Sequence, residues 1–272
     1  MDNDDPPHFD FDFVGELTLQ VVSDVHLELR INKPVIKPVA KILALCGDIG
    51  DPTSKSYTAL IKDASMKFQL VIVIPGNHEY YNCKPFTKIN EIIQGICDRL
   101  KNVRLLLNSS VMIRHNGKYI RFFGSTLWTC TRNCDVASMS DYSNIIYDVV
   151  PRRIHVTREI VSQWHETAVA ALKNVMSSDV PLVVLTHHLP SFRALPPTHS
   201  YSAAYATDLE YLMKAPIFLW IHGHYHEALD YVINNVKVYS HPMRYTKEKT
   251  GYHQEEFLEL TSESVHVHRL SS

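Results

Sequence analysis

The chain has 272 residues, of which 45% are hydrophobic and 21% are charged, and its formal net charge is −2. This composition indicates one compact globular domain and gives no overall basic surface for nucleic acid or an anionic membrane. No apolar run approaches the roughly 18 residues of a membrane span, and the acidic N-terminus is unlike a signal peptide, so we expect a soluble, cytoplasmic protein without a membrane partner.

The first part of the chain alternates between strands and helices. Residues 1–13 carry Asp, Asn, Pro and Phe without a period, which predicts a flexible acidic tail before a single domain over residues 14–272. Strands are predicted at about 17–23, 41–46 and 70–74, and amphipathic helices at about 53–67 and from about 86. This alternation predicts parallel strands joined by crossover helices.

The pattern becomes antiparallel after about residue 100. Asn116-Gly117 lies between two short apolar segments and predicts a hairpin with a type I′ turn. A long helix is predicted over 154–177. Two segments without a clear period, at about 124–151 and 189–206, are predicted insertions, which in a compact domain are usually functional or mobile. The other predicted strands lie at about 103–107, 110–115, 118–123, 181–186, 216–221, 230–233, 237–240, 257–260 and 265–268.

The five cysteines form no regular framework, which suits a reducing compartment. Cys130 and Cys134 could form half of a zinc site or a local disulfide, but the sequence holds no second pair to complete a site. We interpret them as incidental thiols.

Five predicted strands end in side chains that commonly bind metal ions. A polar tetrapeptide after a single strand is more often an ordinary turn, but parallel strands place their carboxyl ends along one edge of a sheet, where ligands bind. The residues concerned are Asp24, His26, Asp48, Asn77, His187, His224 and His226. Carboxylate, imidazole and amide without thiolate suit manganese, zinc, iron, nickel or cobalt. Seven ligands are too many for one tetrahedral ion and suit two ions about 3.5–4 Å apart.

The order of these residues matches a family. The motifs Asp24-x-His26, Gly47-Asp48, Gly76-Asn77-His78-Glu79, His187 and Gly223-His224-x-His226 resemble those of the calcineurin-like metallophosphoesterases over roughly residues 17–226. The resemblance implies an α/β fold, a four-layer α/β/β/α sandwich with a mixed sheet core. Within the superfamily the chain looks most like single-domain phosphohydrolases of bacteria and large viruses, and it lacks the Arg-rich stretches of the protein serine/threonine phosphatases.

The resemblance also implies roles for the residues. One divalent ion would be held by Asp24, His26, Asp48 and His226, and the other by Asp48, Asn77, His187 and His224, with Asp48 bridging. Manganese is the expected metal, and zinc, iron, nickel and cobalt are alternatives. A hydroxide shared by the two ions would attack phosphorus in line, while His78 assists the leaving group. We expect a small phosphoester or nucleotide substrate, and leave open whether it is a monoester or a diester.

Several neighbouring residues have two interpretations. His188 and His222 are expected to pack beside the ligands, because side chains alternate along a strand. Glu79 either orients His78 or caps the following turn. Tyr80 and Tyr81 are packing residues or substrate contacts, with packing the simpler choice. Candidate substrate contacts in or after the insertions are Trp128, Arg132, Arg193, Tyr201, Asp208 and Arg244. A position in a solvated loop, or for Arg244 a surface ion pair, is the simpler interpretation of each.

Two other functions remain open from the sequence. A metal-dependent nuclease would use the same motifs, but the lack of basic excess counts against a long nucleic-acid substrate. A non-catalytic scaffold that binds protein partners would have lost ligands or the spare histidine, whereas every motif position is present here. The sequence fixes neither the substrate nor the oligomeric state.

Overall fold

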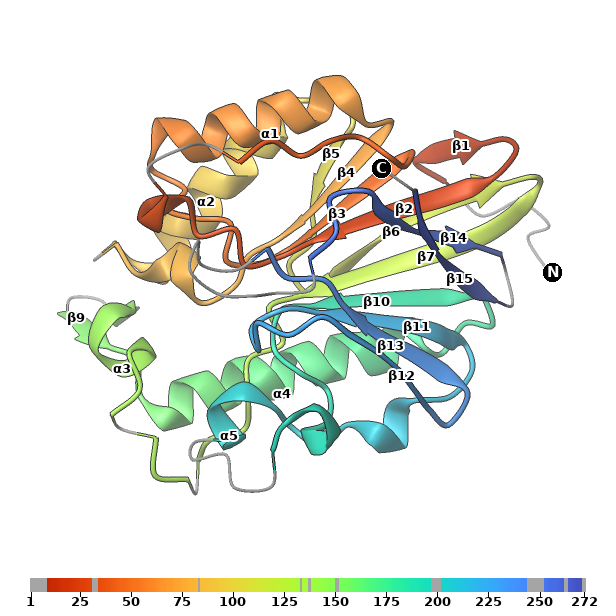
Figure 1. Ribbon diagram of the computed structural model, residues 1–272. Coiled ribbons are helices and arrows are strands. Elements are labelled where there is room, and N and C mark those ends of the chain that lie inside the picture. Colours follow the sequence, from red (N-terminus) through yellow and green to blue (C-terminus); the bar gives the residue numbers. More distant parts are fainter. Residues whose placement is uncertain are drawn as a thin grey trace, which may run out of the picture.

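The structure, a computed structural model, describes residues 9–30, 34–82, 84–132, 134–136, 138–149, 152–196, 202–243, 252–261 and 264–270. Two large sheets form its centre (Figure 1). The six-stranded sheet has the order β15 (Val265–Arg269), β14 (Glu256–Leu260), β2 (Leu17–Val22), β3 (Ile42–Cys46), β4 (Leu70–Ile74) and β5 (Val103–Leu105). The seven-stranded sheet has the order β1 (Phe11–Phe13), β6 (Ser109–His115), β7 (Lys118–Ser125), β10 (Leu182–Thr186), β11 (Ile217–His222), β13 (Val236–Ser240) and β12 (Leu229–Ile233).

Parallel pairing dominates the centre of each sheet. Strands β2 to β5 are parallel neighbours, as are β7, β10, β11 and β13. Antiparallel hairpins close the edges through β14 with β15 and through β12 with β13. Figure 1 shows α1 (Lys55–Lys67) and α2 (Phe86–Cys97) over the outer face of the six-stranded sheet, and α4 (Arg158–Val175) over that of the seven-stranded sheet.

Three apolar clusters hold these elements together. Because side chains alternate along a strand, Leu43 and Leu45 belong to the cluster beneath α1 and α2, whereas Ile42 and Ala44 belong to the cluster between the two sheets. A third cluster, which contains Trp220, lies between the seven-stranded sheet and α4. Strands buried on both faces explain the uninterrupted apolar runs in the sequence. The predicted mixed α/β class is confirmed. One apolar cluster lies between the two sheets, and each of the other two lies between a sheet and the helices that cover it.

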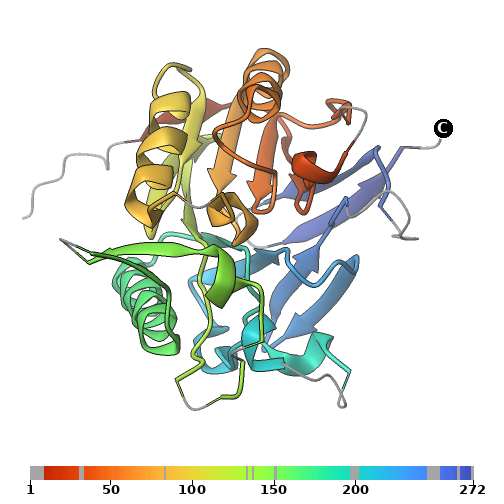
Figure 2. The same cartoon turned by 90° about the vertical axis from the view of Figure 1, so that its left-hand side faces the viewer.

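Some boundaries differ from the prediction. The expected tail ends early, because residues 11–13 form β1 and pair with β6. The insertion at 124–151 contains α3 (Asp141–Asn144) and β8 (Ile146–Val149), which pairs with β9 (Arg152–His155). The long helix therefore starts later than predicted, after Thr157, whose side chain accepts a hydrogen bond from the N–H of Ile160. Figure 2 shows the hairpin of β8 and β9 in green, below α2 in that view.

Other expectations are borne out. Asn116 and Gly117 both have positive φ, 48° and 81°, as a type I′ turn requires. The described cysteines Cys46, Cys97, Cys130 and Cys134 are free. Among the described residues, no helix is both long and apolar enough to cross a membrane.

Candidate metal centre

The loops that follow five parallel strands bring the seven predicted ligands together. Asp24, Asp48 and Asn77 come after β2, β3 and β4 of the six-stranded sheet, whereas His187 and the residues after His222 come after β10 and β11 of the seven-stranded sheet. Positive φ angles of 49° to 70° occur at Asp24, His26, Asp48, His224 and His226. Each such conformation costs about 1–3 kcal/mol outside glycine, and strain of this kind clusters at functional sites.

Two glycines allow the loops to approach each other. A Cβ atom on Gly47, which has φ of 87°, would lie 2.3 Å from Nδ1 of His187. A Cβ atom on Gly76 would lie 2.2 Å from Oδ1 of Asp48. Since neither distance is sterically allowed, only glycine at these two positions lets the two motifs reach their ligand positions.

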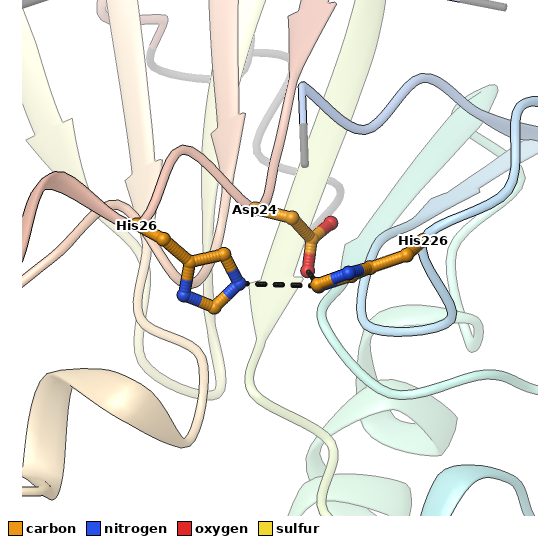
Figure 3. Close-up of side chains that lie close together, drawn as sticks. All are labelled: Asp24, His26 and His226. Carbon is orange, nitrogen blue, oxygen red and sulfur yellow. Dashed lines mark hydrogen bonds and ion pairs between the residues drawn. The ribbon is translucent and has the colours of Figure 1, made fainter. Parts of the chain in front are cut away.

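Asp24, His26 and His226 form a first trio of candidate ligands (Figure 3). Nε2 of His226 lies 3.4 Å from Oδ1 of Asp24 and 3.1 Å from Nε2 of His26. The other ring nitrogen of His26, Nδ1, lies 3.0 Å from the carboxylate of Glu28. Glu28 therefore favours the tautomer of His26 in which Nδ1 carries the hydrogen and the lone pair of Nε2 faces the other two ligands.

Asp48, His187 and His224 form a second trio. Nε2 of His187 lies 3.3 Å from Oδ1 of Asp48 and 3.1 Å from Oδ1 of Asn77. His187 donates Nδ1–H to the carbonyl of Cys46 at 2.9 Å, which orients the ring so that Nε2 faces Asp48 and Asn77. In each trio the candidate ligand atoms lie within 4.8 Å of one another.

The chemistry of this set fits divalent cations. Nε2 of His224 is buried and has no hydrogen-bond partner among the described residues, which is costly unless a cation binds it. Two imidazole nitrogens, of His26 and His226, face each other beside a carboxylate. A metal ion satisfies such convergent acceptors simultaneously.

Burial and mutual charge set the protonation states. Burial alone raises the pKa of Asp48, but the imidazoles of His187 and His78 lower it well below its usual value. Burial lowers the pKa of His187, and the Asp48 carboxylate more than reverses this, raising it to about 10. Burial holds the pKa of His224 well below its usual value, so that its ring is neutral and able to bind a cation.

His78 lies beside the trios without belonging to the predicted ligand set. Its backbone N–H donates to Oδ1 of Asp48 at 2.9 Å, and its ring Nε2 lies 4.0 Å from Oδ2 of the same carboxylate. Its Nδ1 lies 3.2 Å from Glu28, and its ring stacks on Tyr81 with centroids 4.4 Å apart. Burial lowers the pKa of His78, but Asp48 and Glu28 together raise it to about 9.

A cavity of about 380 Å³ opens over both trios. Beyond the candidate ligands and His78, it is lined by Tyr81, Met139, Ser140, Tyr205 and Tyr225. Among the described residues, none of those lining it is Lys or Arg.

Comparison with known proteins identifies the family. The profile of the calcineurin-like phosphoesterases matches residues 17–228. The chain belongs to this family. It is similar to an uncharacterized protein of Acanthamoeba polyphaga mimivirus, with 27% identity over 237 residues, which cover 80% of this chain and 83% of that protein.

Solved structures show the same fold. The phosphopantetheinyl hydrolase of Mycobacterium tuberculosis is similar with a TM-score of 0.67 and 18% identity, over 85% of this chain and 90% of that one. A putative 5'-nucleotidase from Staphylococcus aureus gives a TM-score of 0.50 and 14% identity, over 94% of this chain and 53% of that one. The protein is thus a metal-dependent phosphoesterase of mixed α/β fold.

Other predicted substrate contacts of this phosphoesterase lie elsewhere. Arg193 does not line the cavity, because its guanidinium forms a bidentate ion pair with Glu210 at 2.9 and 2.6 Å. Arg132 pairs with Glu166, and the side chain of Asp208 accepts a hydrogen bond from the backbone of Glu210. Trp128 is buried in the apolar core. Tyr201 and Arg244 lie outside the described residues.

The structure shows where each of the other residues next to the candidate ligands lies. His188 is buried, donates Nδ1–H to the carbonyl of Thr126 at 3.1 Å and packs on His224 with centroids 4.4 Å apart. His222 is also buried, and burial lowers its pKa to about 4. Tyr80 packs in the core beneath α2, whereas Tyr81 faces the cavity.

Glu79 has neither of its predicted roles. Its buried carboxylate accepts backbone N–H groups from Asp48 at 3.0 Å, Ile49 at 2.8 Å and Gly76 at 2.8 Å. It thereby joins the loop after β3 to the loop after β4. Glu28 and Asp141 were not predicted from the sequence, since neither occupies a ligand position. For Glu28 the available signal was its place two residues after His26.

Proposed function

We propose that this phosphoesterase hydrolyses a small phosphoester at a dinuclear centre. The first ion is held by Asp24, His26, Asp48 and His226, and the second by Asp48, Asn77, His187 and His224. The observation that carries the proposal is the place of Asp48 between the trios, with Oδ1 3.3 Å from Nε2 of His187 and Oδ2 3.8 Å from Nε2 of His26. One carboxylate can thus serve both positions.

Two divalent cations bound there would supply a shared water of lowered pKa and a Lewis acid for the phosphoryl oxygens. Carboxylate, imidazole and amide ligands support manganese as the first candidate, and zinc, iron, nickel and cobalt as alternatives. The protein's own part is to hold the seven candidate ligands in place. Five of them have a strained backbone with positive φ, and Asp24, His26, Asp48, Asn77 and His187 are buried.

His78 is the proposed proton donor to the leaving oxygen. It lines the cavity next to both trios, and Glu28 accepts its Nδ1–H, so that Nε2–H of the imidazolium is left for the substrate. The raised pKa of His78, about 9, keeps the ring protonated at neutral pH, as a general acid requires. The carboxylate of Glu28 stabilises that cationic form.

The cavity supports a small substrate. Its volume, about 380 Å³, accommodates one phosphoryl group and a modest organic group, and tyrosines form much of its rim. Without Lys or Arg among the described lining residues, phosphoryl charge is met by the bound cations and His78. Two proteins of this fold are named as a phosphopantetheinyl hydrolase and a putative 5'-nucleotidase, which supports a phosphoester substrate. Both phosphomonoesters and phosphodiesters fit the proposed centre.

Removal and replacement of metal tests the proposal. Protein stripped with a chelator is expected to hydrolyse none of a panel of aryl phosphomonoesters, aryl phosphodiesters and cyclic nucleotides. Addition of manganese, zinc, iron, nickel or cobalt singly should restore hydrolysis as bound metal, measured by mass spectrometry, approaches two equivalents. Full activity in the metal-free protein would overturn the proposal, and the ratio of monoester to diester rates identifies the subclass.

A further inference from the structure

The side chain of Asn77 has two chemically opposite ends. Its Oδ1 faces the second trio, 3.1 Å from Nε2 of His187, whereas its Nδ2 points away from the trio. Only Oδ1 can bind a cation, because the amide nitrogen has no available lone pair and carries two hydrogens. The two ends have almost the same shape, so steric packing cannot decide which one faces the ligands.

Two groups select the orientation by chemistry. Nδ2 of Asn77 donates to Oδ1 of Asp141 at 2.9 Å and to the hydroxyl of Tyr81 at 2.9 Å. The Tyr81 hydroxyl in turn donates to the same oxygen of Asp141. A carboxylate accepts hydrogen bonds and cannot donate them, so a flipped amide would put two acceptors together in a buried place. Asp141 is only 6% exposed, which makes that arrangement costly.

The segment that carries Asp141 is anchored to the rest of the molecule. Asp141 opens α3, and its carbonyl accepts the N–H of Ile145 at 3.0 Å. The next residue, Tyr142, shares a hydrogen bond of 2.9 Å with Thr131. The backbone of Thr131 donates to Oγ of Ser162 in α4 at 3.0 Å. The insertion at 124–151 thus connects α4 to a candidate ligand 64 residues earlier in the chain.

We propose that Asp141 is a positioning residue that, with Tyr81, fixes the amide of Asn77 with its oxygen toward the second cation. This inference rests on the proposed dinuclear centre. It assigns the insertion a task in assembling the metal site, beyond forming a rim around the substrate.

Metal binding to Asp141→Asn tests the proposal directly. The variant keeps the size of the side chain but removes the obligatory acceptor, so that Asn77 can flip. Equilibrium dialysis with manganese should give two sites in the unmodified protein. In the variant we expect one site with affinity lowered about 10–100-fold and the other site unchanged, the usual effect of removing a group that supports a ligand. Tyr81→Phe, which keeps the carboxylate, should weaken the same site by less.

A double variant that exchanges the amide and the carboxylate separates the effect of amide orientation from a general loss of structure. Asn77→Asp alone places two carboxylates in contact and should weaken the second site. Adding Asp141→Asn to it supplies an amide donor to the new carboxylate and should recover part of the lost affinity. A purely structural role for Asp141 predicts the opposite, a further loss in the double variant. Ser143→Ala, on the exposed side of α3, is the matched control and should bind manganese like the unmodified protein.

The outcomes distinguish the two proposals. If the unmodified protein binds neither manganese nor zinc, iron, nickel or cobalt, the dinuclear centre itself fails. If it binds two ions and Asp141→Asn also binds both normally, or the double variant is no better than Asn77→Asp, the positioning role of Asp141 is wrong and the centre stands.

Discussion

The two trios differ in how far apart in the sequence their ligands lie from the groups that orient them through hydrogen bonds. In the first trio, His26 is held by Glu28, only two residues away. In the second trio, His187 is held by the carbonyl of Cys46, 141 residues earlier in the chain, and its neighbour Asn77 by Asp141, 64 residues later. The group that orients His26 therefore lies within one loop, whereas the groups that hold His187 and Asn77 depend on the correct packing of distant segments.

The largest effect should come from Asp48, which lies between the two trios. Asp48→Asn weakens both cation positions, since a neutral amide replaces the carboxylate between them, and we expect kcat/KM to fall on the order of a thousandfold or more. Bound metal measured alongside turnover checks the reason. Retention of two tightly bound ions in this variant would contradict the bridging role, whatever the rate.

His78→Ala should remove the proton donor and leave both trios intact. We expect kcat to fall roughly a hundredfold with about two equivalents of metal still bound, because general acid catalysis typically contributes this much. The loss should be smaller for a substrate whose leaving group is a weak base, such as a nitrophenolate. Equal losses for good and poor leaving groups would rule out the acid role.

Glu28→Gln should have the smallest effect and the clearest pH dependence. The active form of His78 is protonated, and the rate falls as pH rises through its pKa, which burial lowers and which the carboxylate of Glu28 raises. A neutral Gln removes one of the raising charges, so the pKa falls and the alkaline decline of kcat begins at lower pH. A pH profile with the decline unmoved would show that Glu28 acts on His26 alone.

The sequence predicted the candidate ligands of both trios but the residues that orient them in neither. Ligand positions were predictable because motifs at the ends of parallel strands must converge at one edge. Glu28 was within reach of such reasoning, since it follows His26 closely. Asp141 was not, because it lies in a segment without periodicity and acts through a contact that exists only in the folded chain. The role of Glu79 was not predicted for a related reason. Its partners are backbone N–H groups, which no sequence pattern reveals.

The fold, too, was predicted accurately in segments with a strong hydrophobic period and less accurately in the others. Buried strands and amphipathic helices have strong periods and were located to within a few residues, while the hairpin of β8 and β9 was assigned in part to the loop and in part to the helix. Arg193 was predicted as a substrate contact, and nothing in the sequence reveals that its guanidinium pairs with Glu210 in the folded chain.

Each trio takes ligands from both large sheets. Asp24 and Asp48 follow strands of the six-stranded sheet, and His226 and His187 follow strands of the seven-stranded sheet. A cation in either position therefore acts as a cross-link between the two halves of the molecule, and one that the unfolded chain cannot reproduce. By mass action, free metal a thousandfold above its dissociation constant adds about 4 kcal/mol to the free energy of unfolding. The supply of metal ions would then determine how long the folded protein survives proteolysis, in addition to its catalytic rate.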